Sequence, residues 1–245
     1  MITLCVDPGL RNLSLCVMNS NYEILLWDVF NILDSDDYHC KGIFKNGKEC
    51  GRKCTMKHKK EETLIYTCKT HFPKEIKRTK IHDFKKKNID DYLLQDIANT
   101  FIKRLQEIYE LNPVLKTLTN ILIELQPKCN PKMLFISHIL YGKFIELYKN
   151  TIPIRFVRAS QKLRAYTGPS IECKLKGKYA QRKWLSIRYG QWFLENKFSQ
   201  EQRDKWLPTL TGKLDDRNDT FLMAINAITG IPKKQITNKK GKCIK

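Results

Sequence analysis

Two short apolar runs stand in the stretch Ile2-Thr-Leu-Cys-Val-Asp7-Pro8-Gly9-Leu-Arg-Asn12-Leu-Ser-Leu-Cys-Val-Met18, one on each side of a Pro-Gly turn. A third apolar run follows at 22–30, after Asn19-Ser-Asn21. Short apolar runs bounded by turn residues are typical of β-strands. Because the connections are short, neighbouring strands are expected to run antiparallel. The sequence therefore predicts three antiparallel strands at 2–6, 13–18 and 22–30.

Helices and strands alternate through the rest of the chain, after a polar interruption. Apolar periodicity fades between residues 34 and 87, where Lys, Cys and His accumulate, so we interpret this segment as an insertion. Helical spacing of apolar residues resumes at Ile89, with Asn88 as the expected cap. Helices are predicted at 89–110, 131–149, 177–195 and 215–230, and strands at 119–125 and 152–157. The order βββ, insertion, αβαβ predicts an α/β domain of residues 1–33 and 88–231, an insertion at 34–87 and a basic tail at 232–245.

The chain carries a large excess of basic residues. Its 45 Lys and Arg against 25 Asp and Glu give a formal charge of +20, and residues 40–87 hold 16 basic against 5 acidic residues. Such an excess indicates a polyanionic partner. Since no stretch approaches the roughly 20 apolar residues of a membrane-spanning helix, we expect the partner to be nucleic acid and expect no membrane association.

The cysteines indicate a reducing environment. Their number, nine, is odd, whereas a disulfide framework normally uses an even set in a small secreted chain. The stretch from Met1 to Asp7 enters an apolar strand without the basic region and cleavage site of a signal peptide. We therefore expect an intracellular, reducing location.

Four carboxylates from three distant segments are candidates for a shared site. Asp7 ends the first strand, Glu124 interrupts an apolar strand, and Asp216 and Asp219 share one face at a helix start. Asp7 alone could be a turn residue, and Asp216 and Asp219 could be acids favoured by the helix dipole. Glu124 is harder to explain, because a lone buried carboxylate must be paired, protonated or bound to metal. The four acids predict a catalytic site with two Mg²⁺ or Mn²⁺ ions, suited to phosphodiester hydrolysis.

A second cluster, in the insertion, contains five zinc-type ligands: Cys40, Cys50, Cys54, Cys68 and His71. A structural zinc ion takes four ligands in a tetrahedron, so one of the five is spare. Cys68-x-x-His71 has a knuckle spacing, and Gly47-Lys-Glu-Cys50-Gly51 resembles a turn that presents a thiolate. We therefore predict Cys40, Cys50, Cys68 and His71 as the ligands, with Cys54 as the alternative, and expect His39 and His58 to be solvated. Zinc would supply folding free energy to this polar insertion.

Two further groups of residues are predicted to contact DNA. Gln126, Asn130 and Lys132 follow the strand that carries Glu124, which would place them beside the scissile phosphate. Basic residues near the start of the 177–195 helix are expected to contact phosphates; they are Lys174, Lys176, Lys178, Arg182 and Lys183. The alternative is a solvated amphipathic helix whose aromatic residues pack on the sheet.

These motifs resemble those of the RuvC-like Holliday junction resolvases, and in particular the poxvirus-type branch found in large DNA viruses. The matching stretches, in order, are Val6-Asp7-Pro8-Gly9 with Asn12, Ile123-Glu124-Leu125-Gln126, Asn130-Pro131-Lys132-Met133 and Lys213-Leu-Asp-Asp216-Arg-Asn-Asp219. The resemblance covers the chain except the insertion and the tail.

The resemblance implies an RNase H-like five-stranded mixed sheet flanked by helices. It also implies a homodimer that cuts two opposed strands of a four-way DNA junction, with metal-binding roles for Asp7, Glu124, Asp216 and Asp219. The role of Asp215 stays open. A viral origin would place the protein in a viral factory, or in the nucleus or cytoplasm of the host.

Two alternatives remain open at this point. The same carboxylates would serve an RNase H-fold nuclease that acts on flaps, replication forks or RNA–DNA hybrids. A non-catalytic, zinc-dependent nucleic-acid-binding protein would keep the basic surface and the cysteine cluster without using the acids. Cleavage of a panel of labelled substrates separates these functions.

Overall fold

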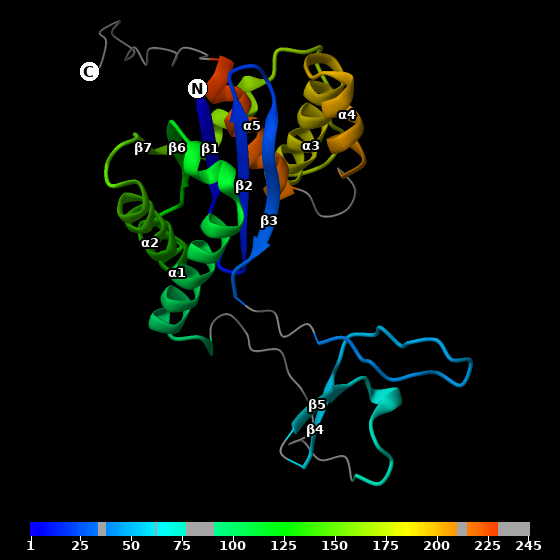
Figure 1. The fold of residues 1–245 in the computed structure, drawn as a ribbon. Helices are drawn as coiled ribbons and strands as arrows, with labels where there is room; N and C mark the ends of the chain where they lie inside the picture. Colours follow the sequence, from blue (N-terminus) through cyan, green and yellow to red (C-terminus); the bar gives the residue numbers. More distant parts are fainter. Residues whose placement is uncertain (34–37, 62, 77–90, 210–214, 230–245) are drawn as a thin grey trace, which may run out of the picture. The chain divides into compact units, whose positions relative to one another are not determined.

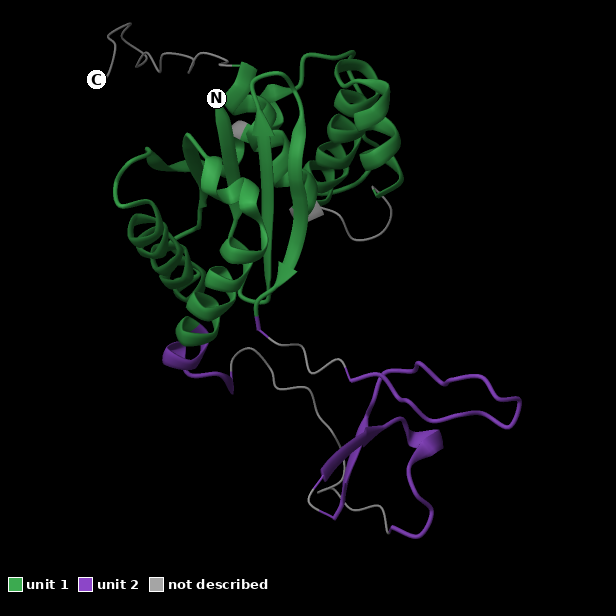
Figure 2. Cartoon of the chain, viewed as in Figure 1, with its two compact units in different colours: residues 1–32, 98–245 green, residues 33–97 purple. Residues whose placement is uncertain are grey.

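The computed structural model describes residues 1–33, 38–61, 63–76, 91–209 and 215–229, and only the backbone of Gln161, Asp215 and Asp216. The predicted tail at 232–245 and the predicted cap Asn88 lie outside the described residues. The chain divides into two compact units (Figure 2). The sheet unit comprises Met1–Ile32 and Ala98–Lys245, and the cysteine unit comprises Leu33–Ile97.

The sheet unit is built on five strands: β1 (Ile2–Asp7), β2 (Asn12–Asn19), β3 (Ile24–Asn31), β6 (Asn120–Leu125) and β7 (Ile154–Arg158). Their order is β3-β2-β1-β6-β7. β1, β2 and β3 are antiparallel neighbours, whereas β1, β6 and β7 are parallel neighbours. This arrangement confirms the predicted five-stranded mixed sheet, in which tight turns join the antiparallel strands and helical crossovers join the parallel ones.

Helices flank this sheet (Figure 1): α1 (Leu94–Leu111), α2 (Pro131–Tyr148), α3 (Lys178–Lys197), α4 (Gln200–Trp206) and α5 (Asp215–Thr229). Short 3-10 helices lie at η4 (Pro113–Thr117), η5 (Ala159–Ala165) and η6 (Leu207–Thr209). The predicted start of the first helix, residue 89, lies outside the described residues; in the described part of the chain α1 begins at Leu94, and the side chain of Leu93 is 69% exposed rather than on the buried face. The sequence analysis missed α4, whose seven residues are too few to show a helical period.

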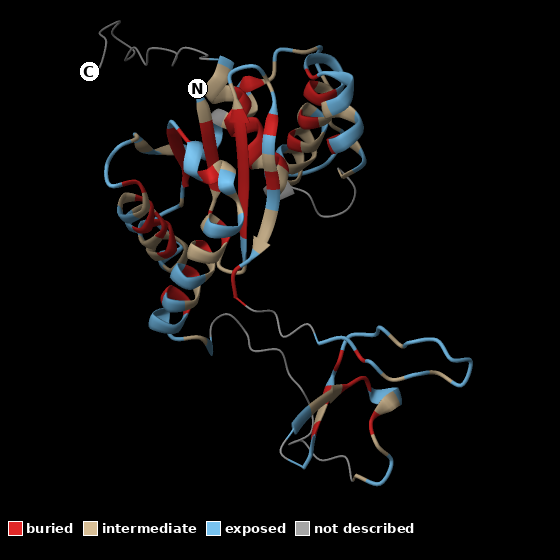
Figure 3. Cartoon of the chain, in the orientation of Figure 1, coloured by how far each residue is buried: buried red, intermediate tan, exposed pale blue. Residues whose placement is uncertain are grey.

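The two faces of the sheet pack against different helices. Side chains alternate along a strand, and Cys5, Cys16 and Leu122 join the core cluster that includes Phe221 of α5. Figure 1 shows α5 on one side of the sheet and α1 and α2 on the other. The central strands are buried on both faces (Figure 3), which explains why their apolar residues form continuous runs.

The cysteine unit has little regular structure. Its hairpin consists of β4 (Met56–Lys60) and β5 (Thr63–Thr67), followed by the 3-10 helix η1 (Lys69–His71). Buried residues at its centre are mainly thiols, with Met56 and Phe72 near them. The expectation that His58 is solvated was wrong: its side chain is buried and its ring lies edge-on to that of Phe72, 5.5 Å between centroids. Among the described residues, no helix combines the length and the apolar character needed to cross a bilayer.

Candidate functional site

Asp7 and Glu124 are brought together by strand register and side-chain alternation. Cys5 of β1 pairs with Leu122 of β6, and both point toward α5. Two residues further along each strand, Asp7 and Glu124 point the same way. Since β1 and β6 are parallel, both carboxylates lie at the same edge of the sheet. The site is therefore assembled at the carboxyl ends of two neighbouring parallel strands.

The turn after Asp7 requires glycine at position 9. A Cβ placed on Gly9 would lie 2.2 Å from the backbone oxygen of Asn12, which is shorter than any tolerated contact. The turn leaves a cavity of about 170 Å³ beside the carboxylate, lined by Asp7, Pro8, Gly9, Asn12 and Met133. Pro8 and Gly9 thus form part of the wall of the cavity next to Asp7.

Asp219 reaches the site because α5 is anchored to the antiparallel strands. The Trp27 indole N–H donates to the Arg217 carbonyl at 2.8 Å, and the Arg217 guanidinium donates to the Trp27 carbonyl at 2.6 Å. The hydroxyls of Ser14 and Thr220 are hydrogen-bonded at 3.1 Å within the core. These contacts hold the first turns of α5 against β2 and β3, and so determine where Asp219 lies.

The three carboxylates form one compact group. One oxygen each from Asp7, Glu124 and Asp219 lies within 4.8 Å of the others. The Lys162 ammonium lies among them: it donates to the Glu124 carboxylate at 3.1 and 3.3 Å and also to Asp219. Ser186 donates to the other oxygen of Asp219 at 2.7 Å, and the Gln126 amide lies 3.5 Å from Asp7.

Burial and charge oppose each other in this group. Burial raises the pKa of the Glu124 carboxyl above its ordinary value, and the nearby Asp219 carboxylate adds to this, while the Lys162 ammonium opposes both. Burial alone would lower the pKa of Lys162, but the Asp219, Glu124 and Asp7 carboxylates together raise it above the ordinary value. Lys162 is therefore a cation held in place by the acids.

Sequence reasoning found three of these residues and missed two. Asp7, Glu124 and Asp219 were predicted from strand ends and a helix start, and the side chain of Asp216 lies outside the described residues. Lys162 lies in η5, between the predicted strand at 152–157 and the predicted helix at 177–195, where no apolar periodicity indicates an inward-facing side. Ser186 lies on α3, and its contact with Asp219 depends on how α3 packs against α5.

The residues predicted to contact DNA lie in several places. Asn130 caps α2: its side chain accepts a hydrogen bond from the Met133 N–H at 3.2 Å. Lys174 and Lys176 lie before α3, while Lys178 and Arg182 lie in its first two turns, all exposed to solvent. Lys183 lies 4.9 Å from the centre of the Tyr179 ring. Lys132 is in the first turn of α2, and the Gln126 amide lies against the Asp7 carboxylate of the site.

The cysteine and histidine cluster is a second, separate group. Donor atoms of Cys40, Cys50, Cys68 and His71 all lie within 4.8 Å of one another. The His71 Nδ1 lies 3.5 Å from the Cys40 sulfur and 3.4 Å from the Cys68 sulfur, and the sulfurs of Cys50 and Cys68 are 3.7 Å apart. Burial would raise the pKa of the Cys68 thiol, but hydrogen bonds from His71 and Cys50 outweigh it and lower that pKa to about 6. All cysteines in the described part of the chain are free thiols.

The strand order and directions define an α/β fold of the RNase H-like class. Solved structures similar to the chain include the yeast mitochondrial Holliday junction resolvase Ydc2, with 12% identity, coverage of 92% of this chain and 78% of that one, and a TM-score of 0.45. Thermus thermophilus RuvC in complex with Holliday junction substrate shows 9% identity, coverage of 94% of this chain and 95% of that one, and a TM-score of 0.43.

A relative at the level of sequence comes from Acanthamoeba polyphaga mimivirus. The protein, named "Uncharacterized protein L451", is 29% identical over 211 residues, which cover 79% of this chain and 50% of the relative. The chain thus spans about half the length of that relative. No protein-family model matches the chain.

Proposed function

We propose that the chain is a divalent-metal-dependent endonuclease that cuts branched DNA at four-way junctions, as the resolvases that its motifs resemble do. The observation that carries the proposal is the convergence of Asp7, Glu124 and Asp219 within 4.8 Å, around the ammonium of Lys162. Carboxylates so close repel one another, so the site favours bound cations. A structural role for the acids would not require them to meet beside an open cavity.

The donors suit magnesium or manganese. Carboxylate oxygens are hard ligands, which these ions prefer, and the position already attracts a cation in the form of Lys162. Asp7, Glu124, Asp219 and Asp216 would hold the ions. Two bound ions would activate a water molecule and stabilise the leaving oxygen of a phosphodiester. Ser186 and Gln126 would orient Asp219 and Asp7 through the hydrogen bonds that they make.

The basic surface would hold the phosphate backbone. Lys174, Lys176, Lys178 and Arg182 are exposed around the start of α3, the helix that also supplies Ser186 to the site. Contacts of this type position DNA without reading its sequence. We therefore propose that the enzyme recognises the shape of the junction, and that Gln126 and Lys132 lie beside the cut strand.

The proposal includes a homodimer, because cutting two opposed strands of a junction needs two active sites. It also places the protein in the poxvirus-type branch and in a reducing, intracellular setting such as a viral factory. The mimivirus relative supports a viral setting, and the free thiols of the described residues fit a reducing one. Analytical ultracentrifugation of the purified chain tests the dimer directly.

The deciding experiment is cleavage of a labelled four-way junction with Mg²⁺, beside a flap, a fork and an RNA–DNA hybrid. Asp7→Asn and Glu124→Gln keep side-chain volume while removing charge, so both variants should bind the junction but lose cleavage by about 10³-fold or more. Paired, symmetric nicks in the junction alone support the proposal. Preference for the hybrid would contradict junction resolution, and tight binding without cleavage of any substrate would contradict the nuclease assignment.

A further inference from the structure

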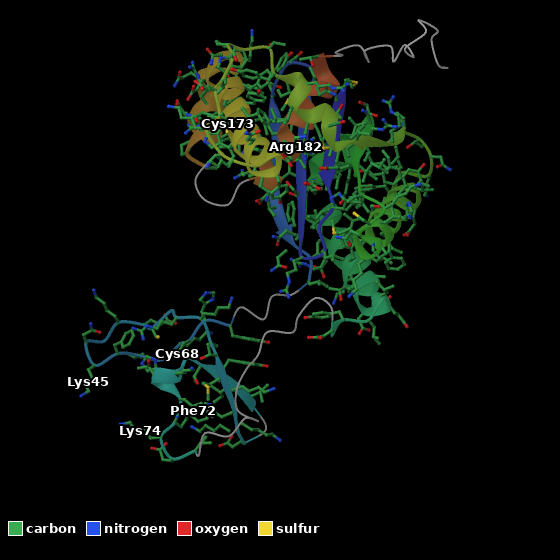
Figure 4. All side chains as sticks on the ribbon, turned by 180° about the vertical axis from the view of Figure 1, so that it is seen from behind. Lys45, Cys68, Phe72, Lys74, Cys173 and Arg182 are labelled. Atoms are coloured by element: carbon green, nitrogen blue, oxygen red, sulfur yellow. The ribbon has the colours of Figure 1, made fainter. Side chains whose placement is uncertain are left out.

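We infer that the cysteine unit holds one structural zinc ion through the thiolates of Cys40, Cys50 and Cys68 and the Nδ1 atom of His71, with Cys54 outside the coordination shell. This site is separate from the carboxylate group of the sheet unit and does not depend on the proposed nuclease activity. Figure 4 shows Cys68 within the cysteine unit, with Lys45 and Lys74 on its surface.

The distances match a zinc tetrahedron. With Zn–S of about 2.3 Å and Zn–N of about 2.0–2.1 Å, ligand atoms in a tetrahedron are separated by about 3.8 Å for two sulfurs and about 3.6 Å for sulfur and nitrogen. The observed Cys50–Cys68 sulfur separation is 3.7 Å, and the two sulfur–Nδ1 separations are 3.5 and 3.4 Å. These separations are far longer than the roughly 2.05 Å of a disulfide bond.

The backbone around the ligands is shaped for this arrangement. The Gly42 N–H lies 3.4 Å from the Cys40 sulfur, where it donates to that sulfur. A Cβ on Gly42 would lie 2.4 Å from the His71 ring, so only glycine lets the imidazole come this close. Gly51, directly after Cys50, has a left-handed φ of +57°. The loop with Cys40 and Cys50 and the segment with Cys68 and His71 therefore converge without a clash.

The donor set selects the metal and its role. Three thiolates and one imidazole in a tetrahedron favour zinc over the hard cations that carboxylates bind. Four protein ligands fill the shell and leave no open position for a substrate, which makes the site structural rather than catalytic.

Cys54 has a different role in the same cluster. Its thiol is buried and packs beside the other cysteines, but it does not belong to the group of four donors that lie within 4.8 Å of one another. Its backbone N–H donates to the Tyr38 carbonyl at 2.7 Å, which ties the segment before β4 to Tyr38. Cys54 therefore acts as a small apolar core residue.

Zinc also accounts for how the unit folds. Its buried cluster consists of Cys40, Cys54 and Cys68, with Cys50 and Tyr66 partly buried against them. So small a core does not offset the conformational entropy of ordering the chain, whereas a structural zinc ion contributes its binding free energy to folding.

The test uses the full chain and does not depend on cleavage. Elemental analysis of the purified protein should find about one zinc per chain. Cys68→Ala and His71→Ala should reduce zinc to background, the matched Cys54→Ala variant should retain it, and His71→Cys should restore it because it replaces one ligand by another. Cobalt substitution adds a check on ligand identity, since thiolate-to-cobalt charge-transfer absorption should be unchanged in Cys54→Ala and stronger in His71→Cys.

Folding can be followed separately in the two units. All four tryptophans, at 27, 184, 192 and 206, belong to the sheet unit. Removal of zinc should make residues 33–97 sensitive to protease while tryptophan emission stays unchanged. The assignment would be overturned if the purified chain held no zinc, or held iron in its place. It would also be overturned by a mass lower by about 2 Da, which indicates a Cys50–Cys68 disulfide, or by a zinc loss in Cys54→Ala equal to that in Cys68→Ala.

Discussion

Lys162→Met should destabilise the sheet unit when divalent metals are absent, and Mg²⁺ should reverse the effect. The Lys162 ammonium is largely buried and contacts both Glu124 and Asp219. Two like charges 4.8 Å apart, the limiting separation in this group, repel by about 3.5 kcal/mol at an effective dielectric constant of about 20. Removing the cation exposes the three acids to this repulsion. Methionine keeps the length of the side chain, so lost charge rather than lost volume dominates.

The net cost is smaller than the sum of the pair energies, because a buried carboxylate can take up a proton instead. Removing one partner of a buried ion pair typically costs about 3–5 kcal/mol. We therefore expect a loss of about 3 kcal/mol in EDTA, which corresponds to a fall in Tm of about 6–12 °C for a unit of this size. Thermal unfolding followed by tryptophan emission reports on the sheet unit alone, since it contains all four tryptophans.

Mg²⁺ should raise the Tm of Lys162→Met more than that of the unmodified chain, because no ammonium then competes for the carboxylates. Lys103 is an exposed residue of α1, so Lys103→Met serves as the control. It should change neither the Tm in EDTA nor the rise in Tm on adding Mg²⁺. Equal stability of Lys162→Met and the unmodified chain in EDTA would refute the electrostatic reasoning. An equal gain from Mg²⁺ in both proteins would refute the idea that lysine and metal share one position.

Three further predictions follow from individual contacts. Asn130→Ala should lower the free energy of unfolding by about 1 kcal/mol, because the α2 cap is lost, and Asn130→Ser should restore this stability in thermal unfolding. If Asn130→Ser also restores junction binding, Asn130 has no separate role with DNA. Arg217→Met should lower the free energy of unfolding in urea by about 1.5–3 kcal/mol, because a charged donor to the Trp27 carbonyl is lost. An unchanged urea midpoint would show that this contact does not anchor α5. Replacing both Lys176 and Lys178 by alanine should reduce the slope of log affinity against log salt by about 0.9 for each lost phosphate contact, and an unchanged slope would exclude both from the DNA interface.

The sequence predicted the sheet well because strands with short connections and buried strands leave strong local patterns. The register that brings Asp7 level with Glu124 is seen only in the structure, because alternation determines the face of the sheet that a side chain meets and not how two parallel strands are aligned. Asp219 was predicted from a helix start, although its position depends on the contacts of Arg217 and Trp27, which join residues 190 apart in the chain.

Lys162 could not be predicted, because the sequence around it carries no local pattern that indicates burial. A lysine in a polar segment is normally solvated, and its burial here results from η5 passing over the end of β7 next to α5. His58 shows the same limit in the cysteine unit, where a histidine among lysines is buried against Phe72. Both misplacements arise from tertiary packing that overrides local polarity.

The two groups of ligands differ in ways that would keep their metals apart within one chain. The carboxylates of Asp7, Glu124 and Asp219 offer hard oxygens, and Asp7 also lines a cavity of about 170 Å³, so ions there would be open to exchange and to substrate. The thiols and the imidazole of the cysteine unit are soft or borderline donors, and four of them would close the coordination shell of a zinc ion. Zinc would therefore remain bound while magnesium exchanges. A brief treatment with a weak chelator should then abolish cleavage, and added Mg²⁺ alone should restore it.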